Sequence, residues 1–262
     1  MISSGSKLYY YTSEQAENSA ELVEESPIAI SINDVNYAVI LITPIDIEAF
    51  VIGFCFAEGL ITSPQEILDI TLTQASDDDT PVPLHINANI QLTGRAQQRA
   101  SSIMRHRKGN SGCGLCGIEA IEQSFPELTK LPDSKPLSDP HWNEAKAKFA
   151  EFQKIGQISG AIHGAMLMDP TGTPINFAED IGRHNALDKL IGKALINKTQ
   201  TRGCHVLMSS RCSTELIQKG IRAEIASLGH LASPSTLAVS QARLYGLHLV
   251  HLPRHAAVRH YN

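Results

Sequence analysis

Long hydrophobic runs and a secretory leader are both missing from this chain of 262 residues. Its richest apolar stretch, residues 49–57, spans nine positions and includes a glycine, whereas a membrane helix needs about 20 apolar residues. The opening segment MISSGSKLYYYT has no apolar core of the kind that signal peptides carry. We therefore expect a cytoplasmic protein that neither spans nor binds a membrane.

Cysteine is also scarce, with five residues in the chain. Without a leader, these are expected to be free thiols in a reducing compartment rather than a disulfide framework. A chain of this length buries enough surface to need neither disulfides nor a structural metal. Glycine (18), proline (13) and charged residues (19%) stand at ordinary globular levels, which excludes collagen-like and disordered chains.

Acidic residues are absent from two windows, although the net charge is -5. Residues 80–118 carry five basic residues, and residues 225–262 carry three arginines and five histidines. Chance segregation on a solvated surface would explain one such window. Two of them favour a local anion site over a general nucleic-acid surface. The basic residues are Arg95, Arg99, Arg105, Arg107, Lys108, Arg243, Arg254 and Arg259.

The first part of the chain, residues 27–125, is predicted to be a β-rich α+β unit. Alternating isoleucines around Asn33-Asp34 indicate a hairpin over residues 28–42. Thr43-Pro44 has the residue types of a helix N-cap and first position, and Gly59 would end that helix. The remaining predicted elements are a short helix after a capping box at residues 63–66 and strands over residues 68–74 and 82–92.

Residues 126–140 contain four prolines and are predicted to be a linker. Beyond it, residues 139–262 alternate strands with amphipathic helices, which predicts an α/β domain around a covered, mixed sheet. The predicted strands are 162–168, 174–178, 206–208, 224–227 and 247–252. Four helices are predicted. The first follows an Asp139-Pro140 cap, and the others cover residues 187–195, 213–222 and 234–245, the last of them capped by Ser233.

The sharpest motif is GNSGCGLCG, in which four glycines surround Cys113 and Cys116. Glycine lacks Cβ, so such a loop lets another molecule approach the sulfur closely. The basic run at residues 105–108 would stabilise a thiolate, which is the nucleophilic form of cysteine. These features favour a reactive thiol that carries or transfers a group.

Two other interpretations of the pair stay open. Half of a structural zinc site needs two more ligands, and Cys204 and Cys212, separated by seven residues, do not have the usual spacing. A thioredoxin-like dithiol normally follows a strand, whereas a polar basic segment precedes Cys113. We expect no bound metal.

A second polar cluster lies at a predicted strand-to-helix junction, where α/β proteins often bind ligands. A well-capped surface helix would explain any one member, but their density favours a site. His163 in the strand GAIHGAML is by default a core histidine, and Ser209-Ser210-Arg211 either caps a helix or holds an anion. The junction contains Glu179, Asp180, Arg183, His184, Asn185, Asp188 and Lys189.

Several familiar motifs are absent. Neither GxGxxG nor GxxxxGK[ST] occurs, so the dinucleotide fingerprint and the P-loop are missing. No His or Cys has Glu two residues later, and Gly112 rather than proline precedes Cys113, so a zinc deaminase is not expected.

Five segments give the chain a resemblance to the FdhD family of sulfur carrier proteins, which formate dehydrogenase activity requires. The resemblance covers residues 27–262. Its most specific parts are SGCGLCG and EDIGRHNALDKLIG, in this order and spacing. The other three are TPIDIEAFVIGFCFAEGLI, SSRCSTELIQKG and SPSTLAVSQARLYGLHLV.

The resemblance implies a sulfurtransferase that receives sulfur from a cysteine desulfurase as a persulfide on Cys113, with Cys116 as partner thiol. The sulfur would pass to the molybdenum of a bis(molybdopterin guanine dinucleotide) cofactor, bound transiently as substrate, before its insertion into formate dehydrogenase. The resemblance also implies a homodimer and a cytidine-deaminase-like sandwich joined to a smaller N-terminal unit, without zinc or a permanent cofactor. The residues it places against the guanine nucleotide are Pro253, Arg254, His255, Ala256, Ala257 and Val258.

The sequence departs from the family in that last stretch. PRHAAVRHYN keeps Arg254 and Tyr261 but lacks the family's glycines. Two other functions stay open: a cytosolic dithiol oxidoreductase that uses Cys113 and Cys116, and a non-catalytic chaperone that binds the cofactor or the apo-enzyme.

Overall fold

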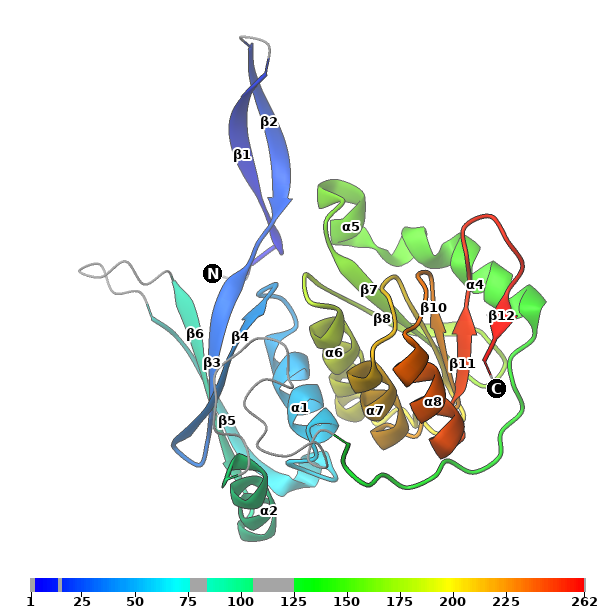
Figure 1. Cartoon of the computed structure of the whole chain (residues 1–262). Helices are drawn as coiled ribbons and strands as arrows, with labels where there is room; N and C mark the ends of the chain where they lie inside the picture. Colours follow the sequence, from blue (N-terminus) through cyan, green and yellow to red (C-terminus); the bar gives the residue numbers. More distant parts are fainter. Residues whose placement is uncertain (1–2, 14–15, 76–83, 106–124, 262) are drawn as a thin grey trace.

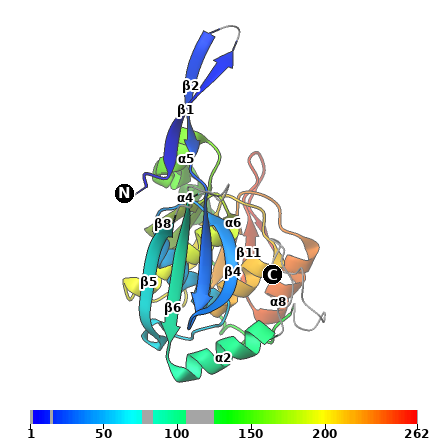
Figure 2. The same ribbon diagram turned by 90° about the vertical axis from the view of Figure 1, so that its left-hand side faces the viewer.

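The computed structural model describes residues 3–13, 16–75, 84–105 and 125–261. A hairpin of β1 (Ser6–Ser13) and β2 (Ala16–Val23) projects from the body of the molecule, as Figures 1 and 2 show. Three consecutive tyrosines, Tyr9 to Tyr11, are exposed on it. At its base, Gly5 packs against the Ile155 side chain of α5 (Lys154–Ser159).

The N-terminal unit is a four-stranded sheet in the order β4-β3-β6-β5. β3 (Ser26–Ile32) and β4 (Val35–Ile42) form the expected hairpin. Its turn residues Asn33 and Asp34 have φ of 47° and 64°, the left-handed values that a two-residue hairpin turn requires. β6 (His85–Leu92) lies parallel to β3, and β5 (Ile67–Ala75) lies antiparallel to β6. One face of this sheet is covered by α1 (Ile47–Ala57) and α2 (Gly94–Arg105).

The C-terminal unit is a six-stranded mixed sheet in the order β12-β11-β10-β9-β7-β8. β9 (His205–Met208), β10 (Ser227–His230) and β11 (His248–His251) are parallel. β7 (His163–Met168) is antiparallel to both β9 and β8 (Pro174–Asp180), and β12 (Arg259–His260) is antiparallel to β11.

Helices cover both faces of the six-stranded sheet. α6 (Arg183–Ile196), α7 (Thr214–Arg222) and α8 (Thr236–Tyr245) pack on one face. α4 (Asp139–Phe152) packs on the other through Trp142 and Phe149. The prediction of a mixed α/β protein with a covered sheet and a β-rich N-terminal unit is confirmed.

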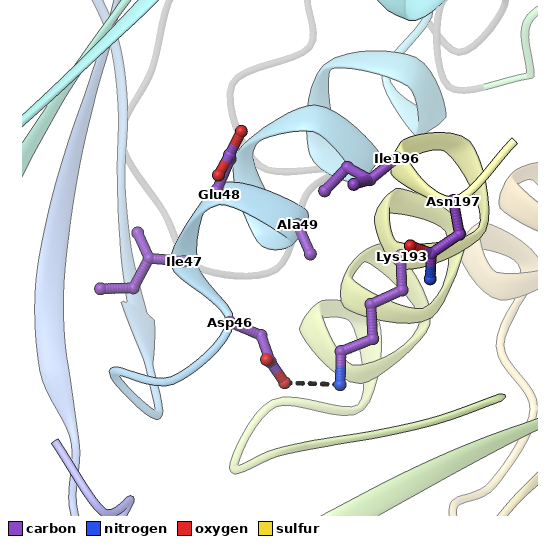
Figure 3. Close-up of a pocket in the computed structure, with 7 residues that line it drawn as sticks. All are labelled: Asp46, Ile47, Glu48, Ala49, Lys193, Ile196 and Asn197. Atoms are coloured by element: carbon purple, nitrogen blue, oxygen red, sulfur yellow. Dashed lines mark ion pairs between the residues drawn. The ribbon is translucent and has the colours of Figure 1, made fainter. Parts of the chain in front are cut away.

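The two units meet where α1 crosses α6. A Cβ on Gly53 would lie 1.8 Å from the carbonyl oxygen of Asp188, and a Cβ on Gly192 would lie 1.8 Å from that of Ala49. The helices therefore pack backbone to backbone. At the edge of this junction, Asp46 pairs with Lys193 at 2.7 Å, and the two residues line a shallow cavity of about 260 Å³ (Figure 3).

Buried ion pairs reinforce the junction. The Lys189 ammonium lies 2.6 Å from the Asp180 carboxylate and donates to the carbonyl of Thr43 at 2.7 Å. The Lys219 ammonium lies 2.7 Å from the Asp188 carboxylate and 3.4 Å from that of Glu58. Burial lowers the pKa of Lys219, but the attraction of Asp188 and Glu58 outweighs it and holds the pKa above its ordinary value. Thr43 and Glu58 belong to the N-terminal unit, so both clusters join the two units.

The predicted Thr43 cap is wrong. α1 begins at Ile47 after Asp46, whose φ is 51°. Thr43 is wholly buried; its N–H donates to Asp180 at 3.0 Å and its hydroxyl accepts from the Ile181 N–H at 3.1 Å. Thr43 does not cap α1 because its backbone N–H and its hydroxyl are both bonded at the end of β8.

Other boundaries also shift. The predicted capping box is only a 3₁₀ turn, η1 (Pro64–Glu66), because the Glu66 carboxylate accepts from the Thr62 N–H and pairs with Arg99. β10 begins three residues later than predicted, α2 was not predicted at all, and Ser235 rather than Ser233 caps α8, accepting from the Ala238 N–H at 3.1 Å.

Residues 126–138 of the expected linker form neither helix nor strand, and α4 begins at Asp139 after Ser138. The domain boundaries stay a prediction. Across the ranges that the structure describes, no helix is both long and apolar enough to cross a membrane.

Candidate functional site

One edge of the six-stranded sheet gathers the segments that the sequence analysis singled out. β8, β9, β10 and β11 all end at this edge and β7 begins there, because β7 runs antiparallel to its neighbours. We call it the carboxyl edge; it lies at the top of the sheet in Figure 1. It brings together His163, the β8–α6 junction, the Ser209–Arg211 turn and the Pro253–Val258 segment.

Part of the junction cluster turns inward and is structural. The wholly buried Asp180 carboxylate accepts from Asn185 at 2.8 Å and pairs with Lys189 at 2.6 Å. The Glu179 carboxylate accepts from the backbone N–H groups of Ile155 and Gly156, at 3.1 and 2.9 Å, and so caps α5. The alternative interpretation, a well-capped surface helix, does not describe these residues, because their ion pair is buried and α6 has no side-chain cap.

Arg183 and His184, in the first turn of α6, lie at the carboxyl edge instead. The His184 Nε2 is 2.8 Å from the Glu215 carboxylate and 3.2 Å from the Ser213 hydroxyl, which joins the first turns of α6 and α7. Burial raises the pKa of Glu215, but the hydrogen bond and charge of His184, together with the charges of Lys219 and Arg183, outweigh it and leave the pKa below its ordinary value. Glu215 is therefore a carboxylate at neutral pH.

His163 is only half buried, and its default interpretation as a core histidine is wrong. Its Nδ1 lies 3.3 Å from the hydroxyl of Ser209, which in turn accepts from the Gly164 N–H at 3.0 Å. Burial and the nearby charge of Arg183 lower the pKa of His163. The imidazole is neutral at pH 7 and faces the same edge as Arg183.

The predicted nucleotide-contacting residues, Pro253 to Val258, form a loop between β11 and β12. The Tyr261 N–H donates to the carbonyl of Leu249 at 2.9 Å, and the ammonium of Lys146 donates to that of Pro253. The loop is thus tied at both ends rather than frayed. Arg254 and His255 are exposed on it at the carboxyl edge.

Two buried histidines at this edge were not singled out from the sequence. His230 and His251 end β10 and β11 and are neighbours in register. The His230 Nδ1 lies 3.0 Å from the carbonyl of Ser210, so this nitrogen carries the proton. In the described residues, the His230 Nε2 and the His251 Nδ1 have no hydrogen-bond partner. Burial lowers the pKa of His230 to about 4. Their position at strand ends in an acid-free window was the available signal.

Three of the five cysteines are buried free thiols: Cys55, Cys204 and Cys212. Burial raises the pKa of all three, that of Cys55 to about 12. They are held as thiols and are poor nucleophiles. The two cysteines expected to carry the chemistry, Cys113 and Cys116, lie outside the described residues.

Within the described ranges, no group of three or more His, Cys, Asp or Glu side chains is arranged to hold a metal ion. Because the CGLCG segment lies outside those ranges, the expectation of no zinc stays a prediction.

Sequence comparison relates the chain to sulfur carrier proteins. The sequence model of the FdhD/NarQ family matches residues 23–262. The chain is 35% identical over 248 residues to the sulfur carrier protein FdhD of Burkholderia mallei, covering 92% of this chain and 88% of that protein. It is 33% identical over 240 residues to the FdhD protein of Acinetobacter baylyi, covering 87% and 81% of the two chains.

The fold has a counterpart among solved structures. A provisionally assigned formate dehydrogenase accessory protein from Desulfotalea psychrophila superposes with a TM-score of 0.69 at 21% identity. The match covers 98% of this chain and 96% of that one. The likeness supports the fold.

Proposed function

The chain belongs to the FdhD/NarQ family, and from that premise we propose that it carries sulfur for formate dehydrogenase as a persulfide on Cys113. Sulfur comes from a cysteine desulfurase and goes to the molybdenum of a bis(molybdopterin guanine dinucleotide) cofactor. The proposal includes a cytoplasmic homodimer that binds this cofactor as substrate, with no resident cofactor. It retains the deaminase-like relationship of the sandwich as a prediction.

The observation that carries the proposal is the burial of the other thiols. Cys55, Cys204 and Cys212 are each at most 3% exposed. Sulfur transfer needs a thiolate that a partner protein can reach. Cys113 and Cys116 are the two cysteines that remain for this role, and they stand among glycines just after a basic run.

Loading is a balanced transfer of one sulfur atom. The Cys113 thiolate attacks the outer sulfur of the desulfurase persulfide. A new S–S bond forms to Cys113, the S–S bond of the donor breaks, and the donor cysteine leaves as a thiolate. No external oxidant or reductant is needed for this step.

Delivery as sulfide requires two electrons, and we assign their supply to Cys116, three positions after Cys113 in the sequence. Its thiolate attacks the Cys113 sulfur, the outer sulfur leaves with the bonding pair as sulfide, and a Cys113–Cys116 disulfide forms. The sulfide replaces an oxo ligand of the molybdenum, and the oxygen leaves as water after taking up two protons. A cellular dithiol then reduces the disulfide for the next cycle.

The carboxyl edge supports the cofactor part of the proposal. Arg254 and His255 are exposed on a loop whose ends are tied to β11 and α4. Arginine grips phosphate through two parallel hydrogen bonds, and histidine donates or stacks. We assign the Pro253–Val258 loop to the guanine nucleotide on this basis, without the glycines that the family usually has there.

Intact mass spectrometry after incubation with a desulfurase and cysteine tests the sulfur carrier. We expect an added mass of sulfur that a thiol reductant removes and that Cys113→Ala abolishes. The matched control replaces Cys55, Cys204 and Cys212 together by alanine and keeps the added mass. Sulfur on one of these three instead, or none on the folded protein, contradicts the proposal; a Cys113→Ala variant that still supports formate dehydrogenase would favour a chaperone.

Calorimetric titration with GDP tests the nucleotide loop. We expect Arg254→Ala to weaken binding at least tenfold, because a charge-assisted hydrogen bond contributes roughly 1.5–3 kcal/mol. The control is Arg202→Ala, an exposed arginine paired with Glu224 just before β9. Equal GDP affinities for wild type and Arg254→Ala would place the nucleotide elsewhere.

A further inference from the structure

We infer that the hairpin of β1 and β2 joins two copies of this chain: the outer edge of β1 pairs antiparallel with that of a second copy, around a twofold axis at Tyr9. The inference rests on the proposed function only in that a homodimer is already expected there, and it adds the surface and the register. The family model matches residues 23–262, so β1 lies outside it and membership of the family assigns this strand no role.

The hairpin leaves most of its apolar surface in water. Its base packs on the body, where Gly5 lies against Ile155 and Ile45, but the strands stand clear of both larger sheets in Figures 1 and 2. An isolated two-stranded hairpin is marginally stable in water, so a further surface is expected to cover it. Five of its large side chains are 47–76% exposed: Leu8, Tyr9, Tyr10, Tyr11 and Leu22.

The outer edge of β1 offers backbone groups to another strand. The Glu24 N–H donates to the carbonyl of Gly5 at 2.8 Å, so these two residues are a hydrogen-bonded pair that continues the β1–β2 register. Hydrogen-bonded and non-hydrogen-bonded pairs alternate along an antiparallel ladder. Leu8 and Tyr10 therefore direct their N–H and C=O groups away from β2. Within the described residues, β1 pairs with β2 alone.

β1 also lacks the features that protect an edge strand. Residues 8–13, LYYYTS, contain neither a charge nor a proline, and Lys7 is paired with Glu24 at 2.8 Å. Natural edge strands are usually blunted by lysine, proline or a bulge, because an open edge pairs with another chain. An unblunted edge beside three exposed tyrosines favours strand pairing over exposure to water.

The edge of β1 is complementary to a second copy of itself. Residues opposite each other in an antiparallel pair are either both hydrogen-bonded or both not. Leu8 and Tyr10 therefore pair with outward-facing residues of the other copy, which are again Leu8 and Tyr10. Identical chains associate most often around a twofold axis through one shared surface, and antiparallel pairing of two β1 strands produces that arrangement.

Lys7 decides where the axis lies. With the axis at Tyr9, Lys7 lies opposite the partner's Tyr11, and an aromatic ring is a favourable neighbour for a cation. With the axis at Tyr10, Lys7 would lie opposite the partner's Ser13 and lose that contact. The register centred on Tyr9 brings no like charges together and pairs Tyr9 with the partner's Tyr9.

The exposed surface is large enough for a dimer. A buried tyrosine covers about 150–250 Å², so three tyrosines that are more than half exposed offer roughly 300–450 Å² in each copy. With Leu8, Leu22 and the strand backbone added, two hairpins can bury about 1,000 Å² in total, the least that a specific interface needs.

Disulfide cross-linking tests the register. Tyr9→Cys, in a chain whose Cys113 and Cys116 are replaced by alanine, should form a covalent dimer when oxidised with copper phenanthroline. Tyr9 and the partner's Tyr9 are a non-hydrogen-bonded pair with Cα atoms about 4.5 Å apart, a separation that a disulfide spans. Tyr11→Cys is the matched control. Its two copies are four residues apart in this register, or about 14 Å, so it should run as a monomer on a denaturing gel.

Sedimentation velocity tests the interface itself. Wild type should sediment as a dimer, and the double variant Leu8→Lys with Tyr10→Lys should have half that mass, because the new lysines of the two copies would lie opposite each other. Leu237→Lys with Leu244→Lys is the control, since it adds the same charges to exposed leucines of α8. This control should sediment as wild type does.

A wild-type monomer, or a dimer that persists in the Leu8→Lys and Tyr10→Lys variant, overturns the inference. Absence of the Tyr9→Cys cross-link while that variant is monomeric overturns the register centred on Tyr9. Neither test involves sulfur. Failure of wild-type Cys113 to accept sulfur, with the dimer intact, would end the proposed sulfur transfer and leave this interface standing.

Discussion

Lys189 is wholly buried, and its ammonium is bound by the Asp180 carboxylate at 2.6 Å and by the carbonyl of Thr43 at 2.7 Å. Lys189→Met would leave the Asp180 charge buried without its ionic partner. Removing one member of such a pair costs about 3–5 kcal/mol. Urea unfolding should therefore show a fall in the free energy of unfolding of that size.

Lys193, one turn further along α6, supplies the control. It pairs with Asp46 at 2.7 Å, but the two side chains are 25% and 37% exposed. Because solvent screens such a pair, Lys193→Met should cost about 1 kcal/mol or less. Equal losses in the two variants would show that burial of the Lys189 pair does not govern the stability of the junction.

His230 should make the protein less stable in mild acid. Burial lowers its folded pKa from 6.5 to about 4. Between these pH values the unfolded chain binds a proton on His230 and the folded chain does not. The free energy of unfolding is therefore unaffected by His230 above pH 6.5 and falls as the pH drops below that value. The loss approaches roughly 3 kcal/mol near pH 4.

The measurement compares wild type with His230→Leu by urea unfolding from pH 7.5 to 4. Loss of the bond to Ser210 gives the variant a constant offset, and other titrating groups affect both proteins alike. Wild type should lose stability relative to the variant only below about pH 6.5. A difference that does not change with pH would mean that His230 is protonated inside the fold.

At the scale of elements, the crossing of α1 and α6 depends on two glycines. Gly53→Ala would place a methyl group 1.8 Å from the carbonyl oxygen of Asp188. Backbone on both sides of the contact cannot retreat without separating the helices, so we expect a loss of at least the 1–3 kcal/mol typical of overpacking. Thermal unfolding should show a clear drop in Tm.

Gly94→Ala is the matched control, because nothing lies within 4 Å of the added Cβ at the start of α2. Alanine is also the better helix former, so this variant should melt at or slightly above the wild-type temperature. A Gly53→Ala protein that melts with Gly94→Ala would show that α1 and α6 can move apart at little cost.

Elements that depend on local pattern were predictable from the sequence, and those that depend on distant contacts were not. The β3–β4 hairpin follows from alternation around Asn33-Asp34, and Gly59 ends α1 as expected, with φ of 76°. The acceptor of the Thr43 N–H is 137 residues away in the sequence, whereas capping preferences consider only neighbouring residues. α2 was missed because only Ala96, Ala100 and Ile103 mark its apolar face among polar residues.

At the scale of the whole molecule, the sequence predicted the segments that form the candidate site but not that they lie together. The dense charge from Glu179 to Lys189 predicted one functional segment, and the absence of acidic residues in the C-terminal tail predicted the other. Only the sheet topology shows that they share one edge: β7 is antiparallel to both β8 and β9, so β8 ends at the same edge as β9, β10 and β11. The division of the cluster into a buried part around Asp180 and a partly exposed part around Arg183 follows from the packing of α1 on α6.

Because of the same packing, we expect each unit to need the other in order to fold, although the proline-rich stretch between them predicts a linker. α6 is buried along most of its length, with the sheet on one side and α1 on the other. A fragment of residues 139–262 would expose the α1-facing side of α6 and leave Lys189 and Lys219 without Thr43 and Glu58. We expect neither this fragment nor residues 1–138 to fold alone, and the two to recover the native fold when co-expressed.

Amide dispersion in NMR spectra and the cooperativity of thermal melting measure this for each fragment and for the pair. A 139–262 fragment that melts cooperatively at the temperature of the whole chain would show instead that the C-terminal sheet is an independent domain and that the α1–α6 junction only docks a second one onto it.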